Sequence, residues 1–474
     1  MSAPRRSGRV AGLAFLSATV WCSTRPATAQ APAESIAARY RDPADRLIVA
    51  ALADTTAYQR LGYLTDRFGN RPSGSASLER AIDWVLATMR SDGLSQVRGE
   101  RVMVPHWVRG AESAELMAPR RLALRLLGLG GSVGTPSKGI TAPVLVVESF
   151  DELTRRAAEA KGKIVLFDVP LATDRPPFKA YDEAVQYRVN GASAGARVGA
   201  RAVLMRSVAS FSIQSPHTGI MLYDSTVARI PTAALSVEDA ELLHRMQRRG
   251  DSVVVRLTMD DRALPEAPSR NIVAELPGAE RPDEVVVLGG HIDSWDVGQG
   301  AVDDGGGALA AWEAVRLMKE LGLRPRRTVR VVLWTSEETG ARGGMAYRDQ
   351  HGEELGRHVL AIESDNGVFS PTGFAFKGSD SAAAVGRQIG GLLERVGAST
   401  IERETEGPEA DVEPLADEGV PAMGLRVDAS RYFWYHHSAG DTFDKIVPAE
   451  LARCVAALAV MAYVVADLPE PLAR

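Results

Sequence analysis

The stretch VVVLGGHIDSWDVGQGAVDDGGG, residues 285–307, decides the fold prediction. Its first four residues form a short apolar run, which is typical of a strand that is buried on both faces of a parallel sheet. His291 and Asp293 follow directly, and Asp303 comes after a glycine-rich turn. In open α/β sheets ligands bind beyond the carboxyl ends of the strands. The sequence therefore predicts a functional site directly after this strand.

Two further apolar runs end in the same way. Residues 328–334 are followed by Glu337 and Glu338, and residues 359–362 are followed by Asp365. Helical periodicity is predicted between and around these strands, at 77–89, 309–321, 382–396 and 448–465. Alternation of strands and helices predicts an α/β fold, with a mostly parallel sheet sandwiched by helices.

The middle of the chain has a different pattern, with short apolar runs separated by turn residues. We expect strands at 144–147, 164–167 and 202–205, and helices at 191–199 and 236–246. His217 and His244 stand alone in this region, and for such histidines a surface or satisfied core position is the default expectation. We predict a β-rich domain over 111–267, inserted into a catalytic domain made of 32–110 and 268–474.

The amino-terminal segment 1–31 has the pattern of a secretory signal peptide. Arg5, Arg6 and Arg9 precede a mostly apolar run at 10–21 that is too short to span a bilayer, and small residues follow it. This pattern predicts export to the periplasm or the extracellular space. No later stretch reaches 18 consecutive apolar residues, so we expect no membrane span.

Composition excludes several classes of protein. The 474 residues are 45% hydrophobic and 24% charged, which argues against a disordered or polytopic membrane protein. The formal charge is −5 and no basic stripe is present, so a nucleic-acid partner is not expected. Removal of 1–31 would leave Cys454 as the single cysteine, so no intrachain disulfide is expected.

The residue types after the strands point to bound metal. Carboxylates crowded at the mouth of a sheet repel one another, and divalent cations remove that repulsion. Imidazoles mixed with carboxylates favour zinc over magnesium or calcium, and His436 and His437 add to His291. A bridging carboxylate would place two ions about 3.5–4 Å apart, which suits hydrolysis.

The adjacent pair Glu337-Glu338 allows a division of labour at a strand end, because neighbouring side chains point in different directions. One glutamate could bind metal while the other acts as a general base. Capping of the following turn is the alternative role. The glycines of 298–307 lack the pattern of a phosphate-binding loop, and they are better explained by a sharp turn that aims Asp303 inward.

Four motifs resemble the co-catalytic zinc peptidase family, which includes zinc aminopeptidases and glutamate carboxypeptidases. They are GGHIDSWDVGQGAVDDGGGA (289–308), LGLRPRRTVRVVLWTSEETG (321–340), ESDNGVFSPTG (363–373) and HHSAGDT (436–442). The segments GKIVLFDVP (162–170) and RSVASFSIQSPHTGI (206–220) are similar to the middle region of family members, so nearly the whole mature chain is covered. This resemblance implies the zinc exopeptidase fold with an inserted protease-associated domain that covers the site.

The resemblance also implies roles for individual residues. Asp303 would bridge two Zn²⁺ ions, and the remaining ligands would divide between them: His291 and Asp365 on one ion, Glu338 and His437 on the other. Glu337 would be the general base, and Asp293 would orient the ring of His291. His437 is favoured as the ligand because it stands four residues before the Asp441-Thr442 pair.

Three further expectations follow from the same family pattern. His436 would donate a hydrogen bond to the developing oxyanion. The peptide between Asp303 and Asp304 would be cis. Asp411 falls in a segment that lies near the substrate in relatives, but its neighbours depart from the family pattern, and neither His217 nor Ser210 is assigned a role.

The implied function is an exported dinuclear zinc exopeptidase of the carboxypeptidase or dipeptidase type, which hydrolyses dipeptides or short peptides and forms a homodimer. Three alternatives remain at this stage. They are an aminopeptidase that acts on longer peptides, a single-zinc glutaminyl cyclase on a related fold, and a receptor-like binding protein that kept the fold without the chemistry.

Overall fold

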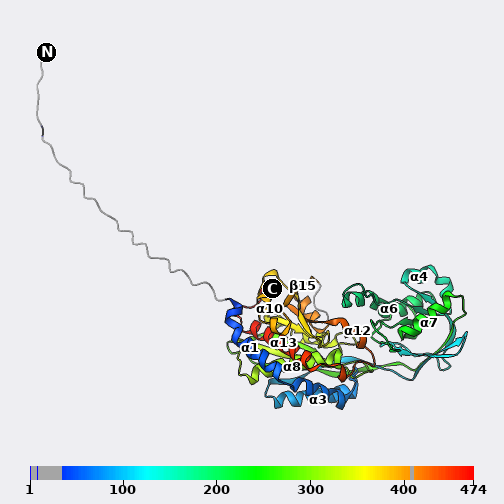
Figure 1. Ribbon diagram of the computed structural model, residues 1–474, viewed down its shortest axis with the longest axis horizontal. Helices are drawn as coiled ribbons and strands as arrows, with labels where there is room; N and C mark the ends of the chain where they lie inside the picture. Colours follow the sequence, from blue (N-terminus) through cyan, green and yellow to red (C-terminus); the bar gives the residue numbers. More distant parts are fainter. Residues whose placement is uncertain (2–7, 9–34, 406–409) are drawn as a thin grey trace. The chain divides into compact units, whose positions relative to one another are not determined.

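The structure is a computed structural model that describes Met1, Gly8, residues 35–405 and residues 410–474. Nearly all of the predicted signal peptide, 1–31, lies outside the described residues. Residues Ile36–Arg474 form one compact unit (Figure 1). Within the described residues, the strands form two eight-stranded sheets. The fold is therefore a mixed α/β fold with two sheets.

The first sheet carries the strands that the sequence places before the site. Its spatial order is β1-β10-β12-β11-β13-β16-β14-β15. The strands are β1 (Ser95–Val108), β10 (Arg262–Leu276), β11 (Arg281–His291), β12 (Arg327–Trp334), β13 (His358–Glu363), β14 (Pro371–Lys377), β15 (Thr400–Arg403) and β16 (Ala422–Val427).

The prediction of a mostly parallel sheet is right for the centre, whereas the flanks are mixed, with β14 and β15 also pairing parallel. Strands β12, β11, β13 and β16 run parallel. However, β10 pairs antiparallel with both β1 and β12, and β14 pairs antiparallel with β16. Strands β1 and β10 are the segments that lead to and return from the second sheet, so they pass each other in opposite directions.

The helices of this part of the chain include the predicted ones. They are α1 (Ile36–Ala53), α2 (Thr56–Phe68), α3 (Ala76–Ser91), α8 (Gly306–Glu320), α9 (Arg342–Gln350), α10 (Asp380–Gly390), α11 (Glu413–Asp417), α12 (Tyr432–Tyr435) and α13 (Pro448–Asp467). Helix α3 begins where the Ser75 side chain accepts a hydrogen bond from the Leu78 amide. The predicted helix 382–396 ends earlier, at Gly390, and a separate short 3-10 turn covers Glu394–Val396.

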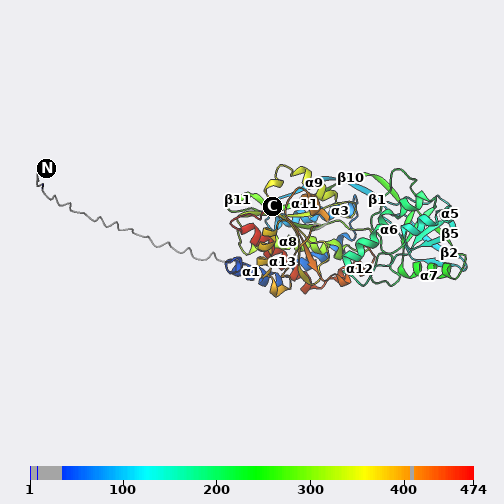
Figure 2. The same ribbon diagram turned by 90° about the horizontal axis from the view of Figure 1, so that it is seen from above.

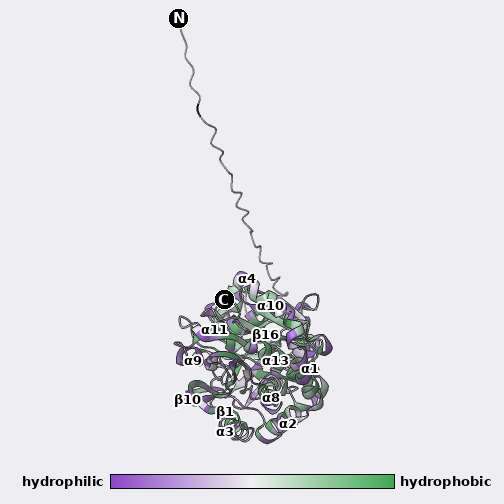
Figure 3. Ribbon diagram, turned by 90° about the vertical axis from the view of Figure 1, so that its left-hand side faces the viewer, coloured by the Kyte–Doolittle hydropathy of each residue, from purple (hydrophilic) through white to green (hydrophobic). Residues whose placement is uncertain are grey.

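Helix α13 is the apolar centre of the first sheet's helical layer. By length and composition alone it could cross a membrane, and it is the one such helix among the described residues. However, 78% of its most apolar window is buried inside the protein. It packs against α1 and α8, and Figure 3 places it among hydrophobic segments in the interior. Its apolar character is therefore that of a core helix.

The second sheet is built from residues between β1 and β10, in the order β3-β2-β9-β5-β6-β7-β8-β4. Its strands are β2 (Glu112–Ala118), β3 (Leu122–Leu124), β4 (Leu126–Gly128), β5 (Ile140–Val147), β6 (Ile164–Phe167), β7 (Ala202–Arg206), β8 (Thr232–Leu235) and β9 (Val254–Met259). Its helices are α4 (Phe150–Arg155), α5 (Ala157–Ala160), α6 (Pro177–Arg197) and α7 (Val237–Arg248).

This second sheet has more helix around it than the sequence suggested. The predicted helix 191–199 is only the last part of α6, which begins at Pro177, a residue favoured at the first turn of a helix. Strands β5 to β8 run parallel in the centre. In Figures 1 and 2, α6 and α7 gather at one end of the unit, and α12 lies between them and α13.

The amino terminus of α8 packs closely against the carboxyl end of β13. A Cβ at Gly307 would lie 1.9 Å from the Ser364 carbonyl oxygen, so only glycine fits there. This close approach brings the loop that carries Asp303 beside the ends of β11 and β13. The fold thereby gathers the three predicted strand-end segments at one place.

Candidate active site

Three of the five candidate ligands come from the carboxyl ends of three neighbouring parallel strands. His291 is the last residue of β11, Glu338 follows β12, and Asp365 follows β13. Asp303 lies in the loop before α8, and His437 lies directly beyond α12. Parallel strands end at the same edge of a sheet, which is why residues so far apart in sequence meet here.

The two oxygens of Asp303 face two different groups of side chains. Oδ1 lies 3.2 Å from His291 Nε2, and Oδ2 lies 3.3 Å from His437 Nε2. His291 Nε2 is also 3.4 Å from Asp365 Oδ1, and His437 Nε2 is 3.0 Å from Glu338 Oε2. Asp303 thus lies between one group containing His291 and Asp365 and another containing Glu338 and His437.

These distances fit donors around a tetrahedral metal ion. Zinc bonds of about 2.0–2.1 Å place neighbouring ligand atoms about 3.3 Å apart. Within the described part of the chain, Asp303 Oδ2 and Asp365 Oδ1 are buried and accept no hydrogen bond. Buried carboxylate oxygens without a donor are costly. A cation on each side of Asp303 would satisfy them, so the residues fit a pair of zinc ions.

His436 also reaches this site. Its Nε2 lies 3.6 Å from Asp303 Oδ2, and its ring stacks on that of His437 with the centroids 3.5 Å apart. Asp303, His436 and His437 have donor atoms close enough to hold one ion. Burial, with the neighbouring His437, holds the pKa of His436 well below its ordinary value. The His436 ring is therefore neutral and keeps one N–H to donate.

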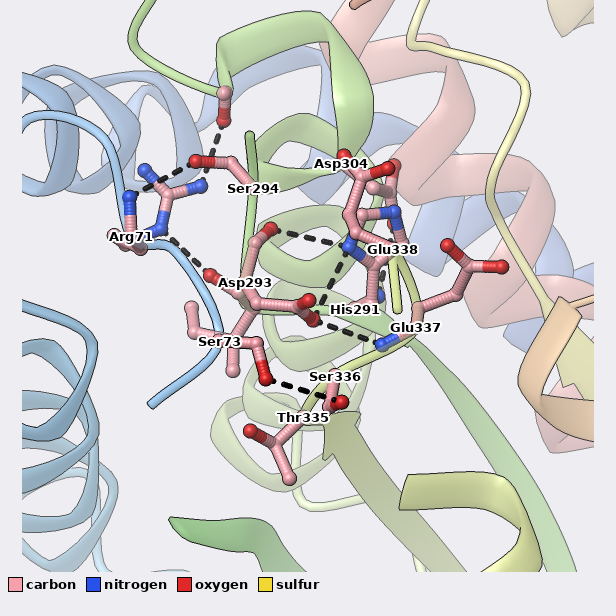
Figure 4. A network of polar contacts seen from close by, with 12 residues as sticks. Arg71, Ser73, His291, Asp293, Ser294, Asp304, Thr335, Ser336, Glu337 and Glu338 are labelled. Atoms are coloured by element: carbon pink, nitrogen blue, oxygen red, sulfur yellow. Dashed lines mark hydrogen bonds and ion pairs between the residues drawn. The ribbon is translucent and has the colours of Figure 1, made fainter. Parts of the chain in front are cut away.

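Asp293 lies behind His291. Its backbone carbonyl is 3.1 Å and its Oδ1 3.5 Å from His291 Nδ1. A carbonyl can only accept, so Nδ1 carries a proton, and Nε2 is the ring atom left for a metal ion. Figure 4 shows the Asp293 carboxylate between His291 and the backbone of Glu337, whose amide donates to Oδ1 at 3.2 Å.

The Glu337 side chain points away from these contacts in Figure 4. Burial raises its pKa well above the ordinary value, and although His291 opposes the rise, Asp365 and Glu338 add to it. Glu338 is affected in the same way, because burial and then Asp303 raise its pKa to about 7. A carboxyl with a raised pKa is suited to taking up and releasing a proton near neutral pH.

The same crowding also raises the pKa values of His291 and His437. Burial lowers the pKa of His437, but Glu338 and Asp303 outweigh it and raise the pKa to about 9. Burial likewise lowers the pKa of His291, and Asp365, Asp293 and Asp303 raise it well above the ordinary value. The site thus carries an excess of negative charge that favours any bound cation.

Three supporting residues have roles that sequence reasoning missed. Asp441 accepts from the amides of Ala301 and Val302, at 2.9 and 2.6 Å, and so holds the loop that carries Asp303. Asp304 accepts the His291 amide at 3.2 Å, and the Asp303–Asp304 peptide is cis, as predicted. The deciding signal for Asp441 was available, because it stands in the HHSAGDT motif.

Arg71 is the third supporting residue, and nothing in its local sequence marked it. Its buried guanidinium donates to the carbonyls of Ile292, Gln299 and Gly300, at 2.6, 2.7 and 2.8 Å. These carbonyls belong to the loops that carry the candidate ligands. Figure 4 shows Arg71 beside Ser294, at the rear of the site.

The residues left without a role in the sequence also have defined positions. Asp411 is buried, and its Oδ1 accepts the Gly344 amide at 2.7 Å.

The two isolated histidines were expected at the surface or as satisfied core residues. His244 meets this expectation, because its Nδ1 lies 2.7 Å from the Asp168 carboxylate. That expectation is wrong for His217, whose ring nitrogens are buried and find no partner among the described residues. The Ser210 amide donates to Phe433 O at 3.2 Å.

The position of His217 explains why it has neither the surface position nor the satisfied core position that the sequence predicted. The segment that contains it packs against the chain around His437, where His217 and Ser438 form an antiparallel bridge. Burial lowers the pKa of His217 to about 4, so the ring is neutral. No local pattern in residues 206–220 indicates this long-range contact.

Comparison with known families identifies the class of protein to which this fold and this group of side chains belong. Residues 271–462 match the model of peptidase family M28. The chain belongs to this family and is a metallopeptidase.

Individual relatives make the similarity more specific. The chain is 48% identical to carboxypeptidase Q of Mus musculus over 440 residues, which cover 92% of each chain. The peptidase M28 precursor of Shewanella amazonensis is 35% identical, with a TM-score of 0.89, and the match covers 92% of this chain and 98% of that one. The zinc aminopeptidase BSAP of Bacillus subtilis, at 20% identity and a TM-score of 0.62, shares the fold over 88% of this chain and 98% of its own.

We predict that the metal-free protein loses stability as the pH rises from about 5 to about 8. Glu338 and Asp441 have pKa values raised to about 7, so their stabilising contribution is complete below their ordinary pKa and is lost as the pH rises through 7. His437, raised to about 9, acts in the same direction. Thermal unfolding with a chelator across this range measures the effect.

The same experiment with zinc provides the control. Zinc binding displaces protons from its ligands, so the gain in Tm on adding zinc should grow with pH. Two results would contradict the description of crowded carboxylates at this site. One is a Tm of the metal-free protein that rises over this pH range, and the other is a Tm increase on adding zinc that is the same at the lowest and the highest pH.

Proposed function

We propose that the chain is an exported dinuclear zinc exopeptidase of the carboxypeptidase or dipeptidase type, which hydrolyses dipeptides or short peptides. The observation that carries this proposal is the position of Asp303, whose two oxygens face two separate groups of ligand atoms 3.2 and 3.3 Å away. A shared carboxylate between two ligand groups is the arrangement that a two-metal hydrolytic site requires.

The ligands divide between two ions in this proposal. His291 and Asp365 would hold one ion, Glu338 and His437 the other, and Asp303 both. When bound, zinc polarises a carbonyl and lowers the pKa of a water molecule to about 7. The buried oxygens of Asp303 and Asp365 that accept no hydrogen bond within the described residues support this assignment.

Glu337 is the proposed general base. It takes the proton from the attacking water as oxygen bonds to the scissile carbonyl carbon. It then gives that proton to the leaving nitrogen as the C–N bond breaks, so that an acid and an amine are released. Its raised pKa and its separation from the ligand contacts support this role.

Asp293 and His436 have positioning and binding roles in the proposal. Asp293 fixes the ring of His291 through Nδ1, which keeps Nε2 available as a ligand. His436 donates a hydrogen bond from its neutral ring to the oxygen that becomes negative during attack. Its position beside Asp303, 3.6 Å away, places it at the same side of the site as His437.

The substrate class is inferred from the relatives. The similarity to carboxypeptidase Q, at 48% identity over 92% of the chain, favours a carboxypeptidase or dipeptidase. An aminopeptidase that acts on longer peptides is the alternative, because BSAP, which shares the fold, is named a zinc aminopeptidase. The presence of all five candidate ligands in one cluster argues against a receptor-like protein and against a single-zinc glutaminyl cyclase.

The domain boundaries and the export are parts of the same proposal. We take 111–267 as an inserted protease-associated domain, and 32–110 with 268–474 as the catalytic domain. The end of β1 at Val108 supports the first boundary, whereas β10 of the first sheet begins at Arg262, a few residues before the second boundary. The pattern of residues 1–31 supports export, and the family resemblance alone suggests a homodimer.

Two substitutions separate the chemistry from metal binding. In Glu337→Gln we expect the turnover of a dipeptide to fall by at least about 10²-fold, because the base is lost. In His436→Phe we expect a fall of about 10-fold to 10³-fold, because an oxyanion donor is lost. Both proteins should still hold two zinc ions per chain, as measured by atomic spectrometry after dialysis.

A Glu338→Gln protein is the matched control, since the adjacent glutamate is a proposed ligand and its loss should release one zinc ion. Full activity of Glu337→Gln would remove the assigned base. Loss of one zinc ion from His436→Phe would make that histidine a ligand instead of a donor.

A substrate panel tests the specificity. We expect hydrolysis of dipeptides with free termini to exceed hydrolysis of aminoacyl amides and of N-blocked dipeptides, measured as kcat/KM on the zinc-loaded protein. Strong activity on the amides without activity on dipeptides would favour the aminopeptidase.

A further inference from the structure

The connection between β7 and β8 of the second sheet contributes to the candidate metal site through the segment His217–Ile220. The Thr218 amide donates to the His437 carbonyl at 2.9 Å. His217 and Ser438 form an antiparallel bridge beside this contact. The backbone around His437 is therefore paired with a segment that follows β7 in the chain.

The same segment also contacts the His437 ring. Nδ1 lies 3.3 Å from the Thr218 carbonyl oxygen. That oxygen can only accept, so Nδ1 donates to it, and Nε2, which faces Asp303 and Glu338, is the ring atom left for a metal ion. A ligating histidine needs such a partner to fix its tautomer and its ring orientation. For His437 the partner comes from the second sheet.

His437 needs this support because its backbone is in an unusual conformation. Its φ is +59°, in the left-handed region that residues other than glycine seldom adopt. Such a conformation persists only where surrounding contacts impose it. The Thr218 amide and carbonyl, which hold the backbone and the ring of His437, are contacts of that kind.

Arg188 of α6 in turn holds the segment that contains Thr218. Its guanidinium is buried and donates to the carbonyls of Ile220 and Thr218, at 3.3 and 3.4 Å. Nη1 is also 3.4 Å from His437 Nδ1, and the two nitrogens are neighbouring donors to the same Thr218 carbonyl oxygen. Gly219 leaves the room for this packing, since a Cβ there would lie 2.3 Å from Nη1.

The side chain of Thr218 is fixed as well. Its hydroxyl donates to the Gly128 carbonyl at 2.7 Å, and Arg109 donates to the hydroxyl at 3.3 Å. Arg109 also forms a bidentate ion pair with Asp296, at 2.7 and 2.9 Å, in the loop that follows His291. The segment is thus anchored on both sides before it meets His437.

We propose that Arg188 is a positioning residue for the metal site, which holds the Thr218 carbonyl against His437 Nδ1 and so orders one of the three proposed ligands of the second ion. This inference rests on the proposed assignment of His437 as a ligand. It makes the second sheet a structural part of the metal site, in addition to any role in covering it.

The test compares zinc affinity in Arg188→Met with that in the wild-type chain. We expect one of the two zinc ions to bind about 10-fold to 100-fold more weakly, while the other is retained with unchanged affinity. Competition with a chelator of known affinity measures both. We also expect kcat to fall with KM nearly unchanged, and the absorption spectrum of the cobalt-substituted protein to shift.

Arg245→Met is the matched control, because Arg245 is an exposed arginine of α7 in the same part of the fold, paired with Glu241. It should bind both zinc ions like the wild type. If Arg188→Met does not fold, Gly219→Ala tests the same contact. The added Cβ would push the Arg188 guanidinium aside, although residue 188 is still an arginine. The same selective weakening of one zinc ion is expected.

The outcomes separate this inference from the proposed function. If His437→Gln keeps both zinc ions, the ligand assignment is wrong and the inference falls with it. If His437→Gln loses one ion while Arg188→Met binds both normally, the inference alone is overturned. Equal weakening of both ions in Arg188→Met would also overturn it, since that result would indicate a general loss of structure.

Discussion

Carboxylates are crowded beyond the carboxyl ends of the parallel strands of the first sheet. Many of the surrounding contacts hold these side chains in place against their mutual repulsion. Asp303 and Asp365 are brought beside other carboxylates in a buried place, where His291 and His437 are the neighbouring groups that offset their charge. Burial and like charge raise the pKa of Glu338 to about 7, and the opposed charges raise that of His437 to about 9. Bound cations at this place would relieve the repulsion and give each carboxylate oxygen a partner.

The rest of the fold holds this unfavourable cluster in position. Asp441 fixes the loop that carries Asp303, and Arg71 ties three carbonyls of the adjoining loops together. The second sheet adds the contacts around His437. A site made of residues from separate strands and loops thus depends on supports from nearly every part of the chain, which is typical of a metal site whose ligands must be oriented.

The sequence predicted the site better than it predicted its supports. His291 and Asp365 were predictable because each follows an apolar run, and the carboxyl ends of parallel strands meet. Arg71 was not predictable, since its role depends on carbonyls that lie more than two hundred residues away in sequence. The same reason applies to His217 and Thr218, whose contacts with the chain around His437 have no local signal. The antiparallel flanks were missed because periodicity reports burial and not strand direction.

The central claim is that Asp303 is shared between two metal ions, and anomalous diffraction tests it most directly. Crystals of the zinc-loaded protein measured at the zinc absorption edge should give two anomalous peaks about 3.5–4 Å apart. One peak should contact His291 and Asp365, the other Glu338 and His437, with the Asp303 carboxylate between them. A single peak, or two peaks that Asp303 does not touch, would contradict the account.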